Sequence, residues 1–398
     1  MRNEFTSIIN EKQLYNKIDS IIWQLIKYTT VFNTPFNNIS GYIYECLLEH
    51  NQLQQLQLQS QSQEIPLTEK QIQDIISERT LTITSSRENL YKLLKLPQVA
   101  QRSPEWYELR KNRLTASAVA QAIGKGKFSS KAELLKDKAF PELAKPFDSY
   151  SSPPLRHGII LEDMTARCYS QRLNNIKIHN FGMIPHETLT CFGASPDGIN
   201  ELGIMVEIKT PYRRRVDGNI PYEYMVQMQG QMAVCNLQEC DFVDAEIWFN
   251  YRSLDDYVND MNIQDNIHDH GIIVEYHDFS TSSKTHIYSP ENLTAKQCIE
   301  WANNYKSTII KEKQSTQDSV ILILPWKLNK IMIKRVYFNE EVWNNLVPQI
   351  EDFWKEVIST RNAGVDALPK KTKYVRKTSA SEPVKIQTAQ FIDSDEDM

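Results

Sequence analysis

Hydrophobic residues follow helical spacing within the first fifty residues of the chain, which predicts an amphipathic helix there. The residues of this stripe are Leu14, Ile18, Ile21, Ile22, Leu25 and Ile26. Residues 52–63 are rich in glutamine, which is typical of a linker or an exposed helix. A second helical stretch is expected from Thr68 to Leu96. Because residues 1–100 contain no catalytic pattern, we predict that they form a helical, Gln-rich accessory segment.

The pattern changes to that of a buried strand between Gly203 and Lys209, where branched apolar residues are bounded by turn formers. Because side chains alternate along a strand, Glu207 and Lys209 are expected on the same face. Asp197 lies in a Ser-Pro-Asp-Gly turn that should lead into this strand through a short hairpin. An Asp and a Glu brought together can bind a hard divalent cation, and a neighbouring Lys can orient or deprotonate a water molecule.

A simpler interpretation of these charges is available. A charged pair on a strand is often the solvated face of an amphipathic sheet, and Asp-Gly is ordinary turn chemistry. The other residues of the strand are almost all apolar, however, which favours an enclosed cleft where unpartnered carboxylates are costly. We therefore take Asp197, Glu207 and Lys209 as candidate catalytic residues.

Two short helices are predicted upstream. Residues 103–105, Ser-Pro-Glu, have the order of an N-cap, a Pro at N1 and an early acid. A second helix is predicted over 114–123 with Thr115 as its cap, and its first turn, where free N–H groups favour an anion, contains Ser117. The residues that can form a phosphate pocket here are Arg110, Arg113 and Ser117. A capped helix beside surface arginines is the alternative.

A further carboxylate lies on the helix predicted over 156–173. Helical spacing places Glu162 on one face with Ala166 and Tyr169. A carboxylate on a face that is otherwise suited to a core is unexpected, so Glu162 is a candidate functional residue. A solvated helix Glu is the alternative.

Polar residues before and within the next predicted helix are also candidates. The basic loop after the Glu207 strand contains Arg213, Arg214 and Arg215, which are suited to contact a phosphate backbone or a groove unless the loop is merely solvated. Residues 222–236 predict a helix in which glutamines alternate with apolar residues, although buried Gln is penalised without a partner. Gly230 within this helix predicts a close backbone approach.

The remaining regular elements are predicted as strands over 176–183, 188–194, 241–250, 320–324 and 330–338 and a helix over 342–358. We assign residues 101–362 to one domain with a C-terminal elaboration. Residues 363–398 are polar, with a basic run followed by an acidic end, and predict a disordered charged tail.

Composition restricts the class of protein. Hydrophobic residues make up 41% of the chain and charged residues 24%, as in soluble globular proteins. No apolar run is long enough to span a bilayer, and the N-terminus lacks the apolar region of a signal peptide. The net charge of -5 argues against a uniformly basic nucleic-acid binder, although charge distribution matters more. Scattered cysteines favour reduced thiols, so we expect an intracellular protein, cytoplasmic or nuclear and not secreted.

Ser-Pro-Asp-Gly followed by Glu-Ile-Lys resembles the PD-(D/E)XK nuclease superfamily, and more narrowly the lambda exonuclease and YqaJ-type viral recombinase family. The match covers roughly residues 101–250. It implies an α/β fold with a mixed central β-sheet flanked by helices, in a restriction-endonuclease-like core. It also implies two Mg²⁺ ions, replaceable by Mn²⁺, with Lys209 orienting the attacking water. The implied metal ligands are Asp197, Glu207, the carbonyl of Ile208 and Glu162.

The resemblance also implies how DNA is bound. It assigns Arg110 and Ser117 to the 5′-phosphate of a DNA end, and Arg215 to DNA near the separating strands. Gln227 or Gln229 corresponds to a glutamine beside the metals, with Gln229 favoured by spacing. The implied activity is 5′-to-3′ degradation of duplex DNA in recombination or repair. The implied partners are double-stranded DNA ends, a single-strand annealing protein and copies of the same chain, a trimer in some members, with no membrane.

Two alternatives remain open from sequence. A structure-specific endonuclease of the same fold would share every catalytic residue, although Arg110 together with Ser117 favours an enzyme that binds ends. A DNA-binding scaffold that does not cleave is the other alternative. Paired acids facing DNA phosphates have little use in such a scaffold, so the Asp, Glu and Lys set argues against it.

Overall fold

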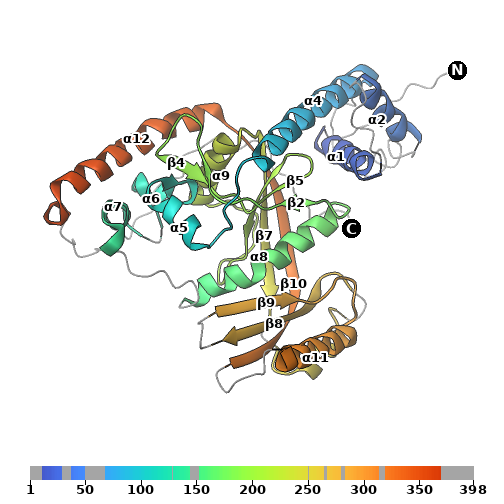
Figure 1. Cartoon of the computed structure of the whole chain (residues 1–398). Helices are drawn as coiled ribbons and strands as arrows, with labels where there is room; N and C mark the ends of the chain where they lie inside the picture. Colours follow the sequence, from blue (N-terminus) through green and yellow to red (C-terminus); the bar gives the residue numbers. More distant parts are fainter. Residues whose placement is uncertain are drawn as a thin grey trace.

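A mixed seven-stranded β-sheet forms the centre of the computed structural model (Figure 1). The structure describes residues 11–28, 37–49, 68–127, 129–143, 152–249, 251–263, 267–278, 283–312 and 319–368. Strands follow the order β2, β5, β6, β7, β10, β8, β9; β6 and β7 are parallel, and the other neighbouring pairs are antiparallel. The predicted α/β class, a mixed sheet flanked by helices, is confirmed.

The described strands are β1 (Leu114–Thr115), β2 (Ile178–His179), β3 (Ile184–Pro185), β4 (Phe192–Ala194), β5 (Gly198–Asn200), β6 (Met205–Lys209), β7 (Glu239–Trp248), β8 (His270–Asp278), β9 (Ser283–Tyr288) and β10 (Ser319–Tyr337). The described α-helices are α1 (Glu11–Tyr28), α2 (Asn37–Glu49), α4 (Glu69–Leu94), α5 (Pro104–Lys111), α6 (Val119–Ala122), α7 (Lys131–Ala139), α8 (Pro153–Arg172), α9 (Tyr222–Cys235), α10 (Leu254–Val258), α11 (Ala295–Glu312) and α12 (Glu340–Ala363). The 3₁₀ turns are η1 (Ala116–Ala118), η2 (Pro141–Leu143) and η3 (Val365–Ala367). In this part of the chain, no helix combines the length and apolarity that a bilayer crossing requires.

The long strand β10 connects the two parts of the central sheet (Figure 1). Its first half pairs with β8 and its second half with β7. The strands predicted over 320–324 and 330–338 are therefore parts of one strand. Pro325, which lies between them, sits opposite Ile272 within the ladder and does not end the strand.

A smaller sheet, in the order β1, β4, β3, lies beside the main one. Its strand β1 occupies residues 114–115, where the sequence predicted the start of a helix over 114–123. That predicted start was wrong. The Leu114 N–H donates to the Cys191 carbonyl at 2.7 Å, and β1 pairs in parallel with β4. Helical structure begins only in η1 and α6, and Thr115 makes no side-chain capping bond. Pairing with a distant segment thus outweighs the local helical preference.

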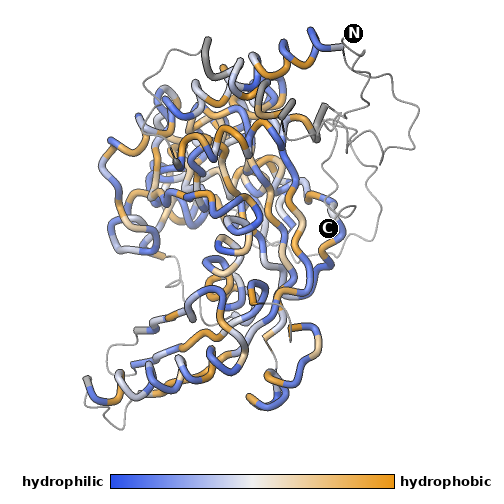
Figure 2. The backbone as a smooth tube through the Cα atoms, turned by 90° about the vertical axis from the view of Figure 1, so that its right-hand side faces the viewer, coloured by the Kyte–Doolittle hydropathy of each residue, from blue (hydrophilic) through white to orange (hydrophobic). Residues whose placement is uncertain are grey.

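Helices pack on both faces of the main sheet, and stretches of hydrophobic residues run along both the strands and the helices (Figure 2). On one face, α9 and α12 share a core with Met205 of β6 and Phe242 of β7. On the other face, α1, α2, α4 and α8 share a core with Val206 and Ile208 of β6 and Val243 of β7. The N-terminal helices thus join the hydrophobic core on the face of the sheet opposite α9.

Several local predictions are confirmed. Thr68 caps α4 through a capping box with Gln71, and the Ser103 hydroxyl accepts from the Trp106 N–H at 3.2 Å at the start of α5. A Cβ on Gly230 would lie 2.9 Å from the Phe192 ring, so this glycine permits the predicted close packing. Residues 52–63 and 369–398 lie outside the described residues, whereas the first residues of the predicted tail complete α12 and η3.

A buried network of charges joins the N-terminal helices to the sheet. Arg79 of α4 donates through Nε to Asp19 of α1 at 2.6 Å and through Nη2 to Glu239 of β7 at 3.0 Å. Arg335 of β10 bonds to the same Glu239 and donates through Nε to Asp241 at 2.6 Å. Removing a cation from such a network leaves buried carboxylates unpaired, which is costly.

Candidate active site

Strand β6 presents Glu207 and Lys209 on the face that α9 covers. Because the side chains alternate, they share this face with Met205, whereas Ile208 faces the opposite core. The Glu207 side chain is completely buried, and 22% of the Lys209 side chain is exposed. Lys209 Nζ forms an ion pair with Glu207 Oε1. The predicted pair therefore lies in an enclosed setting and not on a solvated sheet face.

Two glutamines of α9 bind the two oxygens of Glu207. Gln227 Nε2 donates to Oε1 at 2.6 Å, and Gln231 Nε2 donates to Oε2 at 2.8 Å. Residues four apart share a helix face, so both amides reach the same carboxylate. The sequence analysis did not predict Gln231, although this residue lies four positions after Gln227 and therefore on the same face of the helix.

Gln229, which spacing favoured as the glutamine beside the metals, points elsewhere. Its Nε2 donates to the Tyr337 carbonyl at 2.9 Å, and its Oε1 accepts from the Asn339 N–H at 2.7 Å. A position two residues along a helix lies on nearly the opposite face, so Gln229 ties α9 to the end of β10. The geometry thus places Gln227 at the acid and corrects the preference for Gln229.

Asp197 meets β6 at its open edge. The pairing of β5 with β6 stops at Val206, so the Ile208 N–H is free to donate to Asp197 Oδ2, at 2.7 Å. The N–H and C=O of one strand residue point to the same edge, which puts the Ile208 carbonyl beside Asp197. Burial, together with the charges of Glu207 and Glu162, raises the pKa of Asp197 well above its usual value.

Glu162 of α8 lies close enough to this group to interact with it electrostatically. Its carboxylate accepts from Arg102 Nη2 at 2.7 Å and is 30% exposed. Burial raises the pKa of Glu162, and the charges of Arg102 and Lys209 oppose that rise. The sequence prediction did not include Arg102, whose backbone is in the left-handed region at φ 67°.

Lys209 is held in its charged form. Burial disfavours the ammonium, but the charges of Glu207 and Asp197 outweigh it and raise the pKa of Lys209. The ammonium also lies 4.9 Å from the centroid of the Tyr224 ring. A lysine in this state can neutralise negative charge and orient water, whereas it cannot accept a proton.

The donor set suits a hard divalent cation: two carboxylates, a strand carbonyl and the partly exposed Glu162 are all oxygen ligands. Asp197 and Glu207 already repel each other, so a cation between them would relieve that repulsion. Among the described residues, however, no group of three or more His, Cys, Asp or Glu side chains is close enough to form a ready-made metal site.

The predicted phosphate ligands lie on α5 and beyond it. The Arg110 guanidinium lies 4.1 Å from the centroid of the Trp106 ring, and Trp106 Nε1 donates to the Ser195 hydroxyl at 3.0 Å. Since Ser195 precedes Asp197 by two residues, α5 is tied to the acidic turn. Ser117 is exposed in η1, and Arg113 Nη1 donates to the Leu109 carbonyl at 3.3 Å.

The three arginines after β6 differ in their surroundings. Arg214 forms a two-pronged ion pair with Asp244, with both bonds at 2.7 Å, so it anchors the loop. Arg213 and Arg215 are exposed, and Arg213 lies 5.6 Å from the Tyr212 ring centroid. Two of the predicted DNA-contacting arginines therefore face solvent, whereas Arg214 is occupied by Asp244.

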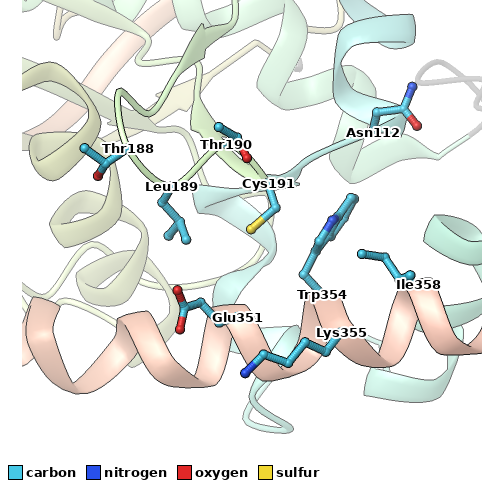
Figure 3. Close-up of a pocket in the computed structure, with 9 residues that line it drawn as sticks. All are labelled: Asn112, Thr188, Leu189, Thr190, Cys191, Glu351, Trp354, Lys355 and Ile358. Atoms are coloured by element: carbon cyan, nitrogen blue, oxygen red, sulfur yellow. The ribbon is translucent and has the colours of Figure 1, made fainter.

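A separate cavity of about 500 Å³ lies between α12 and the segment before β4 (Figure 3). It is lined by Asn112, Thr188, Leu189, Thr190, Cys191, Glu351, Trp354, Lys355 and Ile358. None of the candidate catalytic residues lines it, so this cavity is distinct from the carboxylate site.

The model of the YqaJ-like viral recombinase domain matches residues 105–238. An uncharacterized protein of Acanthamoeba polyphaga mimivirus is 26% identical over 327 residues, which cover 73% of this chain and 58% of the relative. The chain thus spans less than two thirds of that relative's length.

The solved structures that are similar to the chain include two exonucleases. The alkaline exonuclease LHK-Exo from Laribacter hongkongensis is 18% identical, with a TM-score of 0.39 over 66% of this chain and 95% of that chain. A phage-related exonuclease from Haemophilus somnus 129PT is 11% identical, with a TM-score of 0.33 over 62% of this chain and 94% of that chain.

Proposed function

We propose that this chain, whose residues 105–238 form a YqaJ-like viral recombinase domain, is a metal-dependent deoxyribonuclease that degrades duplex DNA from its ends. The observation that carries the proposal is the convergence of Asp197, Glu207 and Lys209 at the open end of β6. Phosphodiester hydrolysis needs a metal site, a positioned water and a cation beside the developing charge, and these residues can supply all three.

Asp197, Glu207, the Ile208 carbonyl and Glu162 would hold Mg²⁺ or Mn²⁺, two ions in the full arrangement. When bound, such ions lower the pKa of water and stabilise the charge on phosphate oxygens. Gln227 and Gln231 orient Glu207 by binding one oxygen each. Lys209 then neutralises charge and orients the water.

Arg110 and Ser117 support action from DNA ends, with the 5′-phosphate seated near the C-terminal end of α5. A fixed 5′ end would give 5′-to-3′ degradation, and the exposed Arg213 and Arg215 would contact the DNA backbone. The product would be a 3′ single strand, the substrate of an annealing protein in intracellular recombination or repair. A homo-oligomer, such as a trimer, would keep the enzyme on its substrate.

We expect the full chain with Mg²⁺ to degrade linear duplex DNA and to leave covalently closed circles intact. A 5′ label should be released before an internal label, and chelator should stop the reaction, because the carboxylates alone cannot activate water. End-labelled linear and circular duplexes, compared on gels, measure this directly. Cutting of closed circles would instead assign an endonuclease, and binding without cutting would assign a scaffold.

Metal affinity is expected to rise with pH by up to about tenfold per pH unit below the raised pKa of Asp197. The sign follows because a metal binds the carboxylate form, so binding must displace a proton from a group whose pKa burial has raised. Calorimetric titration with Mn²⁺ between pH 5.5 and 8 measures the slope. Asp197→Asn should weaken binding and flatten the slope; an unchanged slope in this variant would contradict the assignment.

A further inference from the structure

An exposed aromatic ring lies in the loop that directly follows β6. Tyr212 comes three residues after Lys209 and is 44% exposed, although its large ring would gain from burial. Three residues of extended chain span at most about 11 Å, so the Tyr212 backbone lies within that distance of the Lys209 backbone. A ring this close to the hydrolytic residues can contact the same substrate.

The neighbours of Tyr212 hold its ring in place. The His157 ring, on α8, meets it at an interplanar angle of 75°, with the two ring centroids 5.4 Å apart. The Arg213 guanidinium lies 5.6 Å from the Tyr212 centroid. Arg214 fixes the loop through its ion pair with Asp244. Single exposed aromatic residues are common on protein surfaces, but a ring held in this way loses little freedom when a ligand stacks on it.

His157 contacts Tyr212 through the packing of its ring. It is 7% exposed, and its centroid also lies 5.3 Å from the centroid of the Phe249 ring. Its Nδ1 is buried and has no hydrogen-bond partner within the part of the chain that the structure describes. Because a buried polar atom without a partner costs stability, this position uses the ring of histidine and not its Nδ1. Since α8 also carries Glu162, His157 ties the Tyr212 loop to the helix of that acid.

The charges around Tyr212 favour a nucleic acid strand as its ligand. Arg213 and Arg215 are both exposed in the same loop. Proteins that bind single-stranded nucleic acids combine such cations, which contact the backbone, with aromatic rings on which the bases stack. A base that is still paired is stacked inside the duplex and cannot reach a protein ring. The ligand that fits Tyr212 is therefore an unpaired base.

We propose that Tyr212 is a stacking platform for an unpaired base of the DNA strand that enters the hydrolytic site, and that His157 is the positioning residue for its ring. The inference rests on the proposed nuclease function and adds to it a preference for DNA ends whose last base pairs are open. At a fully paired end, unpairing and unstacking a base costs free energy. An end that is already open avoids this cost.

The test measures binding without hydrolysis. The full chain, in chelator, is titrated with two hairpin duplexes that differ only at their one free end, which is either fully paired or opened by mismatches. We expect the open end to bind about tenfold more tightly, which is the contribution of one base stacked on an aromatic ring. The fluorescent base 2-aminopurine at the unpaired position gives a second measurement, because its fluorescence falls when it stacks on a ring.

Three variants separate stacking from charge. Tyr212→Ala should lose the preference for the open end, keep the affinity for the paired end, and leave the aminopurine fluorescence high. Tyr212→Phe should bind as wild type, because it keeps the ring. Arg215→Gln should weaken binding to both ends equally, since a contact to phosphate does not depend on base pairing. The control is Tyr42→Ala, which changes an exposed tyrosine on α2 and should behave as wild type.

Two further variants test the role of His157. His157→Ala should lower the preference for the open end about threefold, because the Tyr212 ring must then be ordered when the base binds. His157→Phe should keep the preference, since it keeps a ring against Tyr212. It should not lower thermal stability either, because it removes the unpaired Nδ1.

Equal binding of both ends by the wild type, an unchanged preference in Tyr212→Ala, or aminopurine fluorescence that stays constant on binding would each overturn the inference. If Tyr212→Ala does not fold, the fluorescence of the wild-type complex decides the question. Loss of the preference in His157→Phe would remove the role assigned to His157. Because every measurement is made in chelator, a failure to hydrolyse DNA would remove the proposed function and leave this binding comparison valid.

Discussion

Replacing Lys209 with alanine is expected to reduce DNA hydrolysis by at least about a thousandfold while DNA binding changes by less than about threefold. Lys209 supplies the ammonium beside Glu207 at the open end of β6, and the charges of Glu207 and Asp197 keep it protonated. Its loss removes both the neutralising charge and the group that orients water. Single-turnover hydrolysis of end-labelled linear duplex measures the first effect, and binding in chelator measures the second.

The control for this variant is Lys355→Ala, which changes an exposed lysine on α12 and should leave hydrolysis unchanged. Without the Lys209 ammonium, buried Glu207 keeps the amide donors Gln227 and Gln231 but loses the cation that balances its charge. The metal-free variant should therefore also be less stable than the wild type. Thermal unfolding with and without Mg²⁺ distinguishes lost folding from lost chemistry. Turnover at the wild-type rate would remove Lys209 from the assigned role.

Replacing Arg79 with methionine is expected to lower the free energy of unfolding by about 3–5 kcal/mol. The change leaves Arg335 as the remaining arginine of the network, facing Asp19, Glu239 and Asp241, all of which are buried or nearly so. The Arg79 side chain itself is 4% exposed, so water cannot replace its bonds. Urea unfolding of the wild type and the variant at pH 7 measures the difference.

The control here is Lys70→Met, on the exposed surface of α4, which should change stability by less than about 0.5 kcal/mol. Adding Glu239→Gln to Arg79→Met should recover part of the loss, because it removes one unpaired charge.

Arg335 and Arg79 lower the pKa of Glu239 although burial opposes this. The contribution of the Glu239 carboxylate to stability is therefore complete above the pKa that Glu239 has in the unfolded chain. It is lost as the pH falls through the lower pKa that Glu239 has in the folded protein. A wild-type unfolding curve for Arg79→Met would refute the role of the network.

The glutamines of α9 show what helical periodicity can predict and what it cannot. Periodicity predicted the helix, but it could not decide which of its faces meets β6. That choice depends on how α9 packs over the sheet: Gln227 and Gln231 face Glu207, and Gln229 faces the end of β10. The predicted start of the helix over 114–123 was wrong for a related reason, since β1 gains its hydrogen bonds from β4, almost eighty residues away.

The sequence alone determined the features that depend on neighbouring residues: the shared face of Glu207 and Lys209, the capped start of α5, and the glycine in α9. These follow from backbone periodicity and from hydrogen bonds between residues a few positions apart. Only the tertiary structure decided which side chains complete the site and how the N-terminal helices join it. Arg102 reaches Glu162 across 60 residues, and Arg79 reaches Glu239 across 160. Such pairs form only when distant segments pack together, so the spacing of residues along the sequence does not predict them.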